Sequence, residues 1–271
     1  MASKKYTLLV AMLVMLQIAG NAQTKTDWGW DWKDSSKVPT KSIPQYNEFL
    51  NNQFPFPPKP RNAWELGLSL GTAFVVGDRP LFAKNSAGHS YTGGPAIGLS
   101  LRKALGHVVS LRGSAIYSNI SIPSYIQGTT IISSGSNTSL ALSLDALFSL
   151  NTISYYRANP KTNWYVLAGA SLVGTQVKAR QPDGKLLLVS FPYDKVIFTS
   201  HDLNYIHMFD LGAGVAFKLS PKWNLGLEQK FSIPTFGNDN LDGYKKAGAN
   251  RGDFFSYSTI RINMNLGVKN K

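Results

Sequence analysis

The stretch Phe209–Ile233 reads FDLGAGVAFKLSPKWNLGLEQKFSI, and apolar side chains recur in it at every second position. The first run ends at Ser220-Pro221-Lys222, after which the alternation resumes at Trp223. Gln229 is the one polar exception on the apolar face. A period of two predicts β-strands, and a short polar turn between two such runs predicts a hairpin.

The two faces of this predicted hairpin differ in a way that favours a membrane barrel. The non-apolar face mixes Gly and Ala with Asp, Lys and Glu, as expected of a narrow interior where charges must pair. The continuous apolar face, with aromatic residues near its ends, suits lipid. The alternative at this point is an amphipathic hairpin of a soluble sandwich.

The same alternation recurs along the chain and predicts eight strands in all. We expect the other six at 64–75, 94–103, 107–117, 139–150, 164–177 and 254–268. The connections after strands two, four and six are the shorter ones, as in outer-membrane barrels with short periplasmic turns and longer external loops. The predicted fold is therefore all-β, an eight-stranded antiparallel up-and-down transmembrane β-barrel. Strand five is apolar on both faces, so its orientation stays open.

Composition and the N-terminus indicate export. The chain has 271 residues, a formal net charge of +13 and no cysteine, which excludes disulfides and thiolate sites. Residues 1–22 read as a signal peptide, with Lys4 and Lys5 before an apolar run and cleavage expected before Gln23. The alternative, a membrane anchor, needs about 20 apolar residues, which is longer than the run from Tyr6 to Ala19.

Residues 23–63 differ from the rest and read as a periplasmic N-terminal extension before a barrel at 64–268. The extension is polar, ends in a proline-rich spacer at 55–62, and is expected to be irregular or only partly ordered. Trp28, Trp30 and Trp32 stand at alternate positions in it. They could lie at a membrane interface or dock on a partner, and an exposed flexible leader is the alternative.

Nine charged residues are predicted to point into the barrel. Four are acids and five are bases, so the signs nearly balance and indicate a structural ion-pair network. The alternative is a gated or narrow pore, although a barrel of eight strands is filled by its own side chains. The nine residues are Glu65, Arg102, Arg112, Asp145, Asp210, Lys218, Glu228, Lys230 and Arg261.

Other residue types gave weaker candidates for chemistry. No nucleophile motif surrounds His89, His107, His201 or His207, so surface roles are expected. The spacing of Asp239 and Asp242 matches no calcium loop, and a turn role is expected. Arg251-Gly252-Asp253 is an adhesion-like tripeptide in which Gly252 most simply ends a loop. Loop cations could contact glycolipid phosphates, or simply be solvated: Arg79, Lys84, Lys178, Arg180, Lys185, Lys195, Lys245, Lys246 and Arg251.

With eight strands and a signal peptide in place, residues Trp64 to Val268 resemble the eight-stranded outer-membrane barrels related to the N-terminal domain of outer membrane protein A. The stretches WELGLSLGTAFVVGD, GAGVAFKLSPKWNLGLEQKFSI and YSTIRINMNLGVK carry the resemblance. It implies a bacterial outer membrane of the Gram-negative type and insertion by the barrel-assembly machinery. The family's periplasmic peptidoglycan-binding domain has no counterpart before Lys271, and Leu266 and Val268 stand where a terminal Phe is usual.

We therefore expect a non-enzymatic barrel with a structural, anchoring or interaction role. It would display four external loops and contact outer-membrane lipid and glycolipid, with neither a cofactor, a metal nor nucleic acid. One alternative is a subunit of an envelope secretion or assembly complex that docks through the N-terminal extension. Others are a rim-site lipid-modifying enzyme, such as an acyl hydrolase or transferase, and a soluble lipocalin-like carrier.

Overall fold

A computed structural model gives the structure of most of residues 63–266 and short pieces before them. The predicted signal peptide and Trp28, Trp30 and Trp32 lie outside the described residues. The described residues are 36, 43–51, 53, 63–77, 81–85, 88–105, 108–127, 130–132, 134–152, 161–180, 183–188, 197–200, 203–220, 222–235, 241–242 and 252–266.

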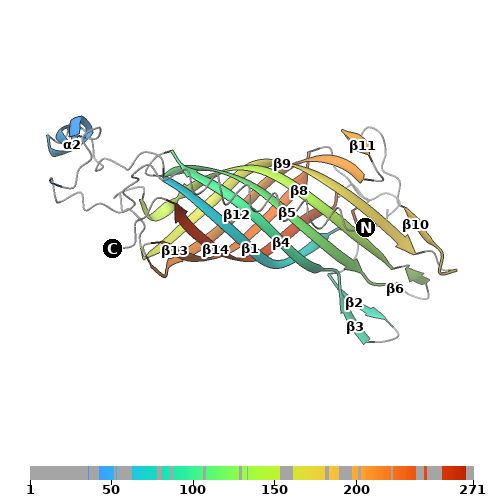
Figure 1. The fold of residues 1–271 in the computed structure, drawn as a ribbon. Helices are drawn as coiled ribbons and strands as arrows, with labels where there is room; N and C mark the ends of the chain where they lie inside the picture. The colour runs from blue at the N-terminus through green and yellow to red at the C-terminus, as the bar shows by residue number, and fades with distance from the viewer. Residues whose placement is uncertain are drawn as a thin grey trace, which may run out of the picture.

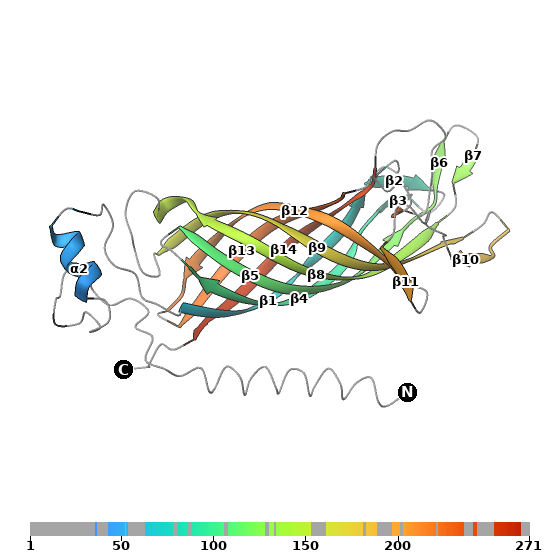
Figure 2. The same ribbon diagram turned by 90° about the horizontal axis from the view of Figure 1, so that it is seen from above.

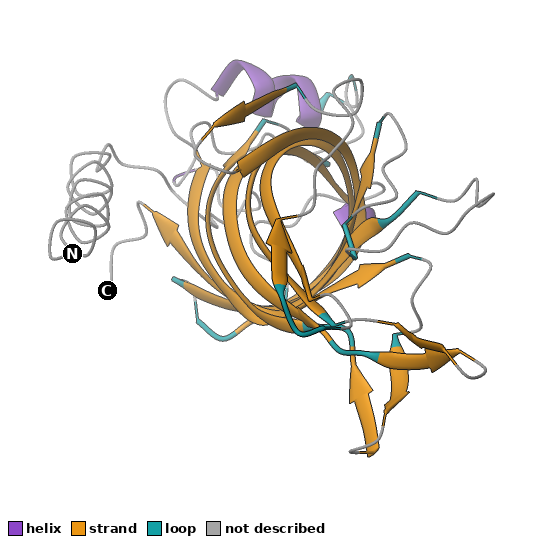
Figure 3. Cartoon of the chain, turned by 90° about the vertical axis from the view of Figure 1, so that its right-hand side faces the viewer, coloured by secondary structure: helices purple, strands orange, loops and turns teal. Residues whose placement is uncertain are grey.

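Eight antiparallel strands form the body of the molecule and close into a ring (Figures 1 and 3). Each strand pairs with the next, β9 pairs with β12, and β14 returns to β1. This confirms the predicted eight-stranded, up-and-down barrel. The strands are β1 (Ala63–Val76), β4 (Gly94–Ala104), β5 (Val109–Ile122), β8 (Gly135–Ser149), β9 (Thr162–Arg180), β12 (Leu203–Lys218), β13 (Trp223–Pro234) and β14 (Phe254–Leu266).

The two ends of the barrel differ in their connections (Figure 2). One end, here the turn end, carries the connections β4–β5, β8–β9 and β12–β13, with the 3-10 helix η3 (Leu150–Thr152) after β8. At the opposite end, here the loop end, short strands project beyond the ring. They are β2 (Phe82–Asn85), β3 (Gly88–Tyr91), β6 (Tyr125–Gln127), β7 (Thr130–Ile132), β10 (Leu186–Leu188) and β11 (Phe198–Ser200).

The turn between β12 and β13 is held by the hydroxyl of Ser220. This oxygen accepts hydrogen bonds from the backbone N–H groups of Lys222 at 3.2 Å and Trp223 at 3.0 Å. Serine is favoured in turns because its side chain can bond to the backbone two or three residues on. The hairpin predicted from Phe209–Ile233 is confirmed, with Phe209 opposite Ile233 and Phe217 opposite Leu225.

The outer wall of the barrel is apolar. Leu142 and Leu144 on β8 and Ile260 on β14 are each more than half exposed on it. Aromatic side chains mark both edges of this wall: Trp64, Phe148, Trp164, Phe217 and Trp223 toward the turn end, and Phe74, Tyr117, Phe209, Phe231 and Phe254 toward the loop end. An apolar band between two aromatic girdles is how a β-barrel meets a bilayer.

No helix in the described ranges is both long enough and apolar enough to cross a membrane.

The structure resolves the orientation of strand five that the sequence left open. Along β9, Tyr165, Leu167, Ser171 and Val173 are buried in the barrel, while Trp164 and Val166 are exposed on the wall. Both faces are apolar because the inner face packs on other interior side chains and the outer face meets lipid. Alternation of polarity therefore carried no information about this strand.

Several strands continue past the points where the sequence predicted loops. β5 extends to Ile122 and β9 to Arg180, and β12 already begins at Leu203. In these extensions the polarity of the two faces is inverted. Ile120 and Ile122 point inward and are buried, while Asn119 and Ser121 are exposed outside. An apolar interior with a polar exterior is the pattern of a barrel in water, so the ring rises beyond the lipid-facing band at the loop end.

In the segment expected to be irregular, residues Ile43–Leu50 form the helix α2, which corrects that expectation for these eight residues. Ile43, Tyr46 and Leu50 recur at helical spacing, and Pro44 lies in the first turn, where its missing N–H is tolerated. Tyr46 is buried, whereas Ile43 and Leu50 are exposed. The helix lies beyond the turn end of the barrel (Figures 1 and 2).

Candidate functional site: the filled barrel interior

The centre of the interior is a bridge between Arg112 on β5 and Glu228 on β13. The guanidinium contacts both carboxylate oxygens, with Nη1–Oε2 at 2.5 Å and Nη2–Oε1 at 3.1 Å. In the closed ring, β5 and β13 are separated by three strands on either side. The two-point ion pair therefore joins opposite walls, and both side chains are almost completely buried.

A second group of charges surrounds Lys230 on β13. Its Nζ lies 2.6 Å from Asp210 Oδ2 and 3.5 Å from Asp145 Oδ1, and it donates a hydrogen bond to Ser143 Oγ at 2.9 Å. Asp145 also accepts from Arg112 at 3.0 Å, which links the two groups. Asp210 further accepts from Ser171 Oγ at 2.9 Å. Partners on several strands thus compensate the cost of burying these charges.

The remaining predicted charges complete the interior toward the turn end. Arg261 Nη1 lies 3.4 Å from Glu228 Oε1, and its Nη2 donates to Ser100 Oγ at 2.5 Å. Glu65 and Arg102, on the neighbouring strands β1 and β4, lie 3.6 Å apart. Ser110 accepts a further hydrogen bond from Arg102 at 3.1 Å.

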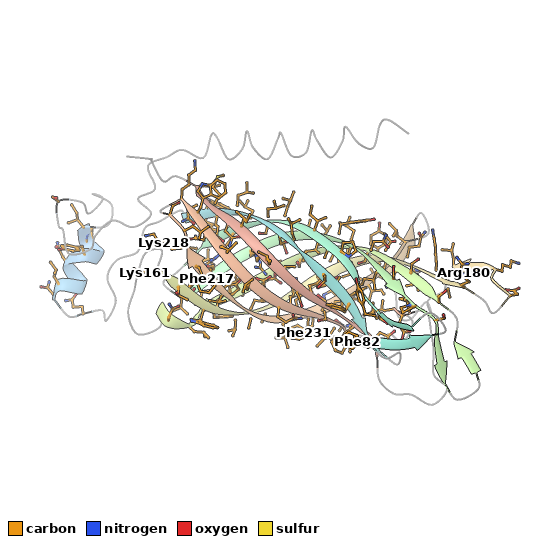
Figure 4. The ribbon with its side chains drawn as sticks, turned by 90° about the horizontal axis from the view of Figure 1, so that it is seen from below. Phe82, Lys161, Arg180, Phe217, Lys218 and Phe231 are labelled. Atoms are coloured by element: carbon orange, nitrogen blue, oxygen red, sulfur yellow. The ribbon has the colours of Figure 1, made fainter. Side chains whose placement is uncertain are left out.

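Lys218 does not belong with the other eight, so its predicted interior position is wrong. It is the last residue of β12, is exposed, and lies at the turn end (Figure 4). Alternation assigns it to the inner face, but the strand ends there and water reaches the side chain. Without Lys218 the predicted set consists of four acids and four bases, all of them in ion pairs, and has no net formal charge.

Uncharged members of this network were not singled out in the sequence. Tyr165 donates to Glu228 Oε2 at 2.7 Å, and Ser143 and Ser171 bond to the charged groups as described above. Glycines make room for the side chains of the network. A Cβ at Gly214 would collide with the Tyr165 hydroxyl, and a Cβ at Gly169 would collide with Asp145. In the sequence, such residues could have been identified as the polar or small residues that recur at every second position beside an inward-facing charged residue.

Beyond the network, toward the loop end, the interior becomes apolar. A cluster that includes Ile120, Val173, Ile206 and Met208 fills the ring there. Leu241, from the β13–β14 connection, is also fully buried in this cluster. Its backbone carbonyl accepts a hydrogen bond from Asn137 Nδ2 at 2.8 Å, and Thr175 Oγ1 donates to Asn137 Oδ1 at 2.7 Å. One loop is thus anchored inside the mouth of the barrel.

The weaker candidates from the sequence are placed as follows. His207 Nδ1 lies 2.8 Å from Thr235 Oγ1. Asp253 of the adhesion-like tripeptide is fully buried, and its Oδ2 accepts from the backbone N–H of Asp242 at 3.1 Å, so this carboxylate is not displayed. Lys178 and Arg180 lie on the outer face of β9, and Lys185 is exposed. Candidates outside the described residues are His107, His201, Asp239, Arg79, Lys195, Lys245, Lys246 and Arg251.

The closed antiparallel ring, its lipid-facing wall and its buried polar interior define a small barrel of the outer-membrane type. No protein-family model and no curated protein matches the sequence. Among solved structures, the chain is similar to Ail, the attachment invasion locus protein of Yersinia pestis, with 11% identity, a TM-score of 0.43 and coverage of 76% of this chain and 99% of that one.

Two further solved structures have a similar architecture. One is Neisserial surface protein A, with 11% identity, a TM-score of 0.41 and coverage of 74% of this chain and 96% of that chain. The other is the N-terminal β-barrel domain of Pseudomonas aeruginosa OprF, with 13% identity, a TM-score of 0.38 and coverage of 75% and 98%. The architecture is also the one implied by the resemblance to barrels related to the N-terminal domain of outer membrane protein A.

Proposed function

We propose that this protein is a closed, non-enzymatic platform in the outer membrane that holds its four external loops for interaction with other molecules. The observation that carries the proposal is the Arg112–Glu228 ion pair, which joins opposite walls inside the barrel. A side-chain bridge at this position occupies the lumen that solutes would have to cross. The apolar cluster, which includes the anchored Leu241, fills the lumen between this ion pair and the loop end.

The hairpin arm β2–β3 supports an interaction role at the loop end. Phe82 is 77% exposed and Tyr91, opposite it in register, is 52% exposed. The ring of Tyr91 lies 6.4 Å from that of Phe74 on the barrel wall, so the arm is attached to a rigid support. Exposed aromatic side chains on a preformed arm are typical of binding surfaces, and Phe82 marks this end in Figure 4.

Cationic side chains near the loop end support contact with phosphate-bearing glycolipid. Lys178 and Arg180 follow each other on the outer face of β9, beyond the apolar band, and Figure 4 shows Arg180 at that end. Lysine and arginine pair readily with phosphate. We include outer-leaflet glycolipid among the molecules that this end would contact.

A photo-reactive amino acid at position 82, in cells that make the whole chain, tests the interaction role. The proposal expects discrete cross-linked species from position 82 that weaken when Tyr91 is replaced by Ser. A matched probe at Lys185, which is also exposed at the loop end, should give none of these species. Equal labelling from both positions, or none from position 82, would refute a binding surface on the arm.

A second candidate function, a subunit of an envelope assembly or secretion complex, is favoured by α2. This helix lies beyond the turn end and exposes Ile43 and Leu50, which an isolated anchor has no need to present. Deleting residues 23–62 should then release a co-purifying complex while the barrel still folds. An unchanged set of co-purifying proteins would contradict this role.

A further inference from the structure

Gln229 is the one polar side chain in the outward series Trp223, Leu225, Leu227, Gln229, Phe231 and Ile233 of β13. It lies between the aromatic residues that mark the two edges of the lipid-facing wall. A polar group at this depth is costly, because lipid offers no hydrogen-bond partners. Polar residues at such positions therefore point to a function.

The neighbours of Gln229 satisfy half of its side-chain amide. Nε2 donates to Ser256 Oγ at 2.8 Å, and Oε1 accepts from Ser258 Oγ. Both serines lie on the outer face of β14, and Ser258 is opposite Gln229 in register. An amide has two N–H donors and two acceptor positions. One donor and one acceptor position of this half-buried amide are thus left over by these bonds.

A donor and an acceptor left on one amide are complementary to the same pair on an identical amide. A second Gln229, related by a two-fold axis along the membrane normal, would supply both missing bonds at once. An acyl chain can supply neither. Closed two-fold contacts, in which the same patch serves both copies, are the commonest form of oligomer. Hydrogen bonds between polar side chains are a known source of association within membranes.

The shape of the wall also suits a second copy. A hollow of about 490 Å³ on the outer wall runs from β9 to β14 and includes Gln229 in its lining, with Trp164, Val166, Ala213 and Val215 on the β9–β12 side. At the β14 edge of this hollow stands Ile260, and beyond it on β1 stands Leu70, each about half exposed. A two-fold axis at Gln229 places the β14–β1 side of one copy against the β9–β12 side of its partner. The prominent side chains of one copy then face the hollow of the other.

We propose that this face of the barrel, centred on Gln229, is the contact surface of a homodimer within the membrane. The two Gln229 amides bond to each other near the axis, and Ser256 and Ser258 orient them. Small side chains around the amide, including Ala213 and Ser258, let the two walls approach closely, as small residues do at other membrane interfaces.

The absence of cysteine from the sequence makes single-cysteine variants clean probes of this contact. Leu227→Cys lies on the proposed interface, and Leu144→Cys lies on β8, three strands around the ring. In bilayers containing the full mature chain, oxidation should cross-link Leu227→Cys copies to each other and leave Leu144→Cys monomeric. Equal cross-linking at both sites would overturn the proposal, as would cross-linking of Leu227→Cys to a different protein alone.

The role of the amide is tested by measuring dimer fraction as lipid dilutes the protein. Gln229→Leu should weaken dimerisation about 3- to 30-fold, the range expected for one or two hydrogen bonds in a membrane. Heat-modifiable gel migration checks that the variant is folded, and Leu on this wall should not impair folding. A wild-type chain that stays monomeric, or a Gln229→Leu chain that dimerises equally well, would contradict the proposal.

Discussion

Arg112 and Glu228 are 116 positions apart in the sequence, yet their side chains form a two-point ion pair across the lumen, with the nearest atoms 2.5 Å apart. The contact exists because the ring closes between β1 and β14, which brings β5 and β13 to opposite walls. Asp145, Arg261 and Tyr165 each bond to one of the two, so the pair is embedded in a larger network.

Breaking this pair on one side should destabilise the barrel strongly. Glu228→Gln leaves Arg112 and Arg261 buried without their shared carboxylate, so we expect a loss of about 3–5 kcal/mol in the free energy of unfolding. The double variant Arg112→Leu with Glu228→Leu removes one charge of each sign and leaves Lys230 paired with Asp145 and Asp210. It should therefore cost less than the sum of the two single leucine variants. Urea titration of the barrel in lipid vesicles measures these values, and strict additivity would contradict the network.

The two lysines Lys218 and Lys230 of the β12–β13 hairpin should differ sharply in their effect on stability. Lys230→Ala leaves Asp210 buried without its cation and Asp145 with Arg112 alone, and should cost about 3–5 kcal/mol. Lys218→Ala removes an exposed side chain and should change the free energy of unfolding by less than about 0.5 kcal/mol. The same urea titration compares them directly. Similar losses in the free energy of unfolding for both variants would mean that Lys218 also lies among the interior charges.

Gly214 and Gly113 should respond differently to the same added methyl group. At Gly214 the new Cβ would meet the hydroxyl end of Tyr165, which donates to Glu228, so Gly214→Ala should cost about 1–3 kcal/mol. At Gly113 a Cβ meets nothing within 4 Å, so Gly113→Ala should be neutral or slightly stabilising. Thermal shift of the heat-modifiable gel band ranks the two variants. Equal tolerance at both sites would mean that Tyr165 is not fixed.

Leu241 should hold the β13–β14 connection in the mouth of the barrel. Leu241→Ala removes a fully buried side chain, so about 2–5 kcal/mol of local anchoring should be lost. The connection should then be cut sooner by protease added outside intact cells, while the barrel keeps its heat-modifiable migration. Leu188→Ala, at an exposed leucine of β10, is the matched control and should leave cleavage unchanged. Identical cleavage of the Leu241→Ala and wild-type chains would contradict the anchor.

The inversion of polarity along β5 predicts where lipid ends. Ser121→Cys, exposed on the outer face of β5 beyond the inversion, should react with a membrane-impermeant thiol reagent in intact cells. Leu142→Cys, on the outer wall of β8, should not react, although more than half of that side chain is free of protein contacts. Equal reactivity at both positions would mean that the wall of β8 meets water, as in a soluble carrier.

The sequence alone was enough to predict which face of a strand each of several side chains lies on. A period of two placed Arg112, Asp145, Glu228 and Lys230 on the inner faces of their strands, because alternate side chains point to opposite faces. It could not tell which charges meet, because the pairing depends on how the ring closes and on the stagger of its strands. It also could not place Lys218, whose exposure is set by where the strand ends.

Two further features escaped the sequence for physical reasons. The extensions of β5, β9 and β12 read as loops because the rule of apolar-out side chains stops where lipid stops. Ile120, Ile122 and Ile206 still alternate there, but on the inner face. The position of Leu241 depends on a long-range contact with Asn137, which no local pattern encodes.

In the proposed function, side chains close the lumen of a membrane-spanning barrel. Planar-bilayer conductance of the purified, folded chain tests it most directly. The wild type should insert without giving stable channels. A triple variant that combines Arg112→Ala, Glu228→Ala and Leu241→Ala removes the ion pair and releases the anchored loop. If this variant retains heat-modifiable migration, it should give measurable conductance. Stable, voltage-independent channels from the wild-type chain would contradict a closed platform.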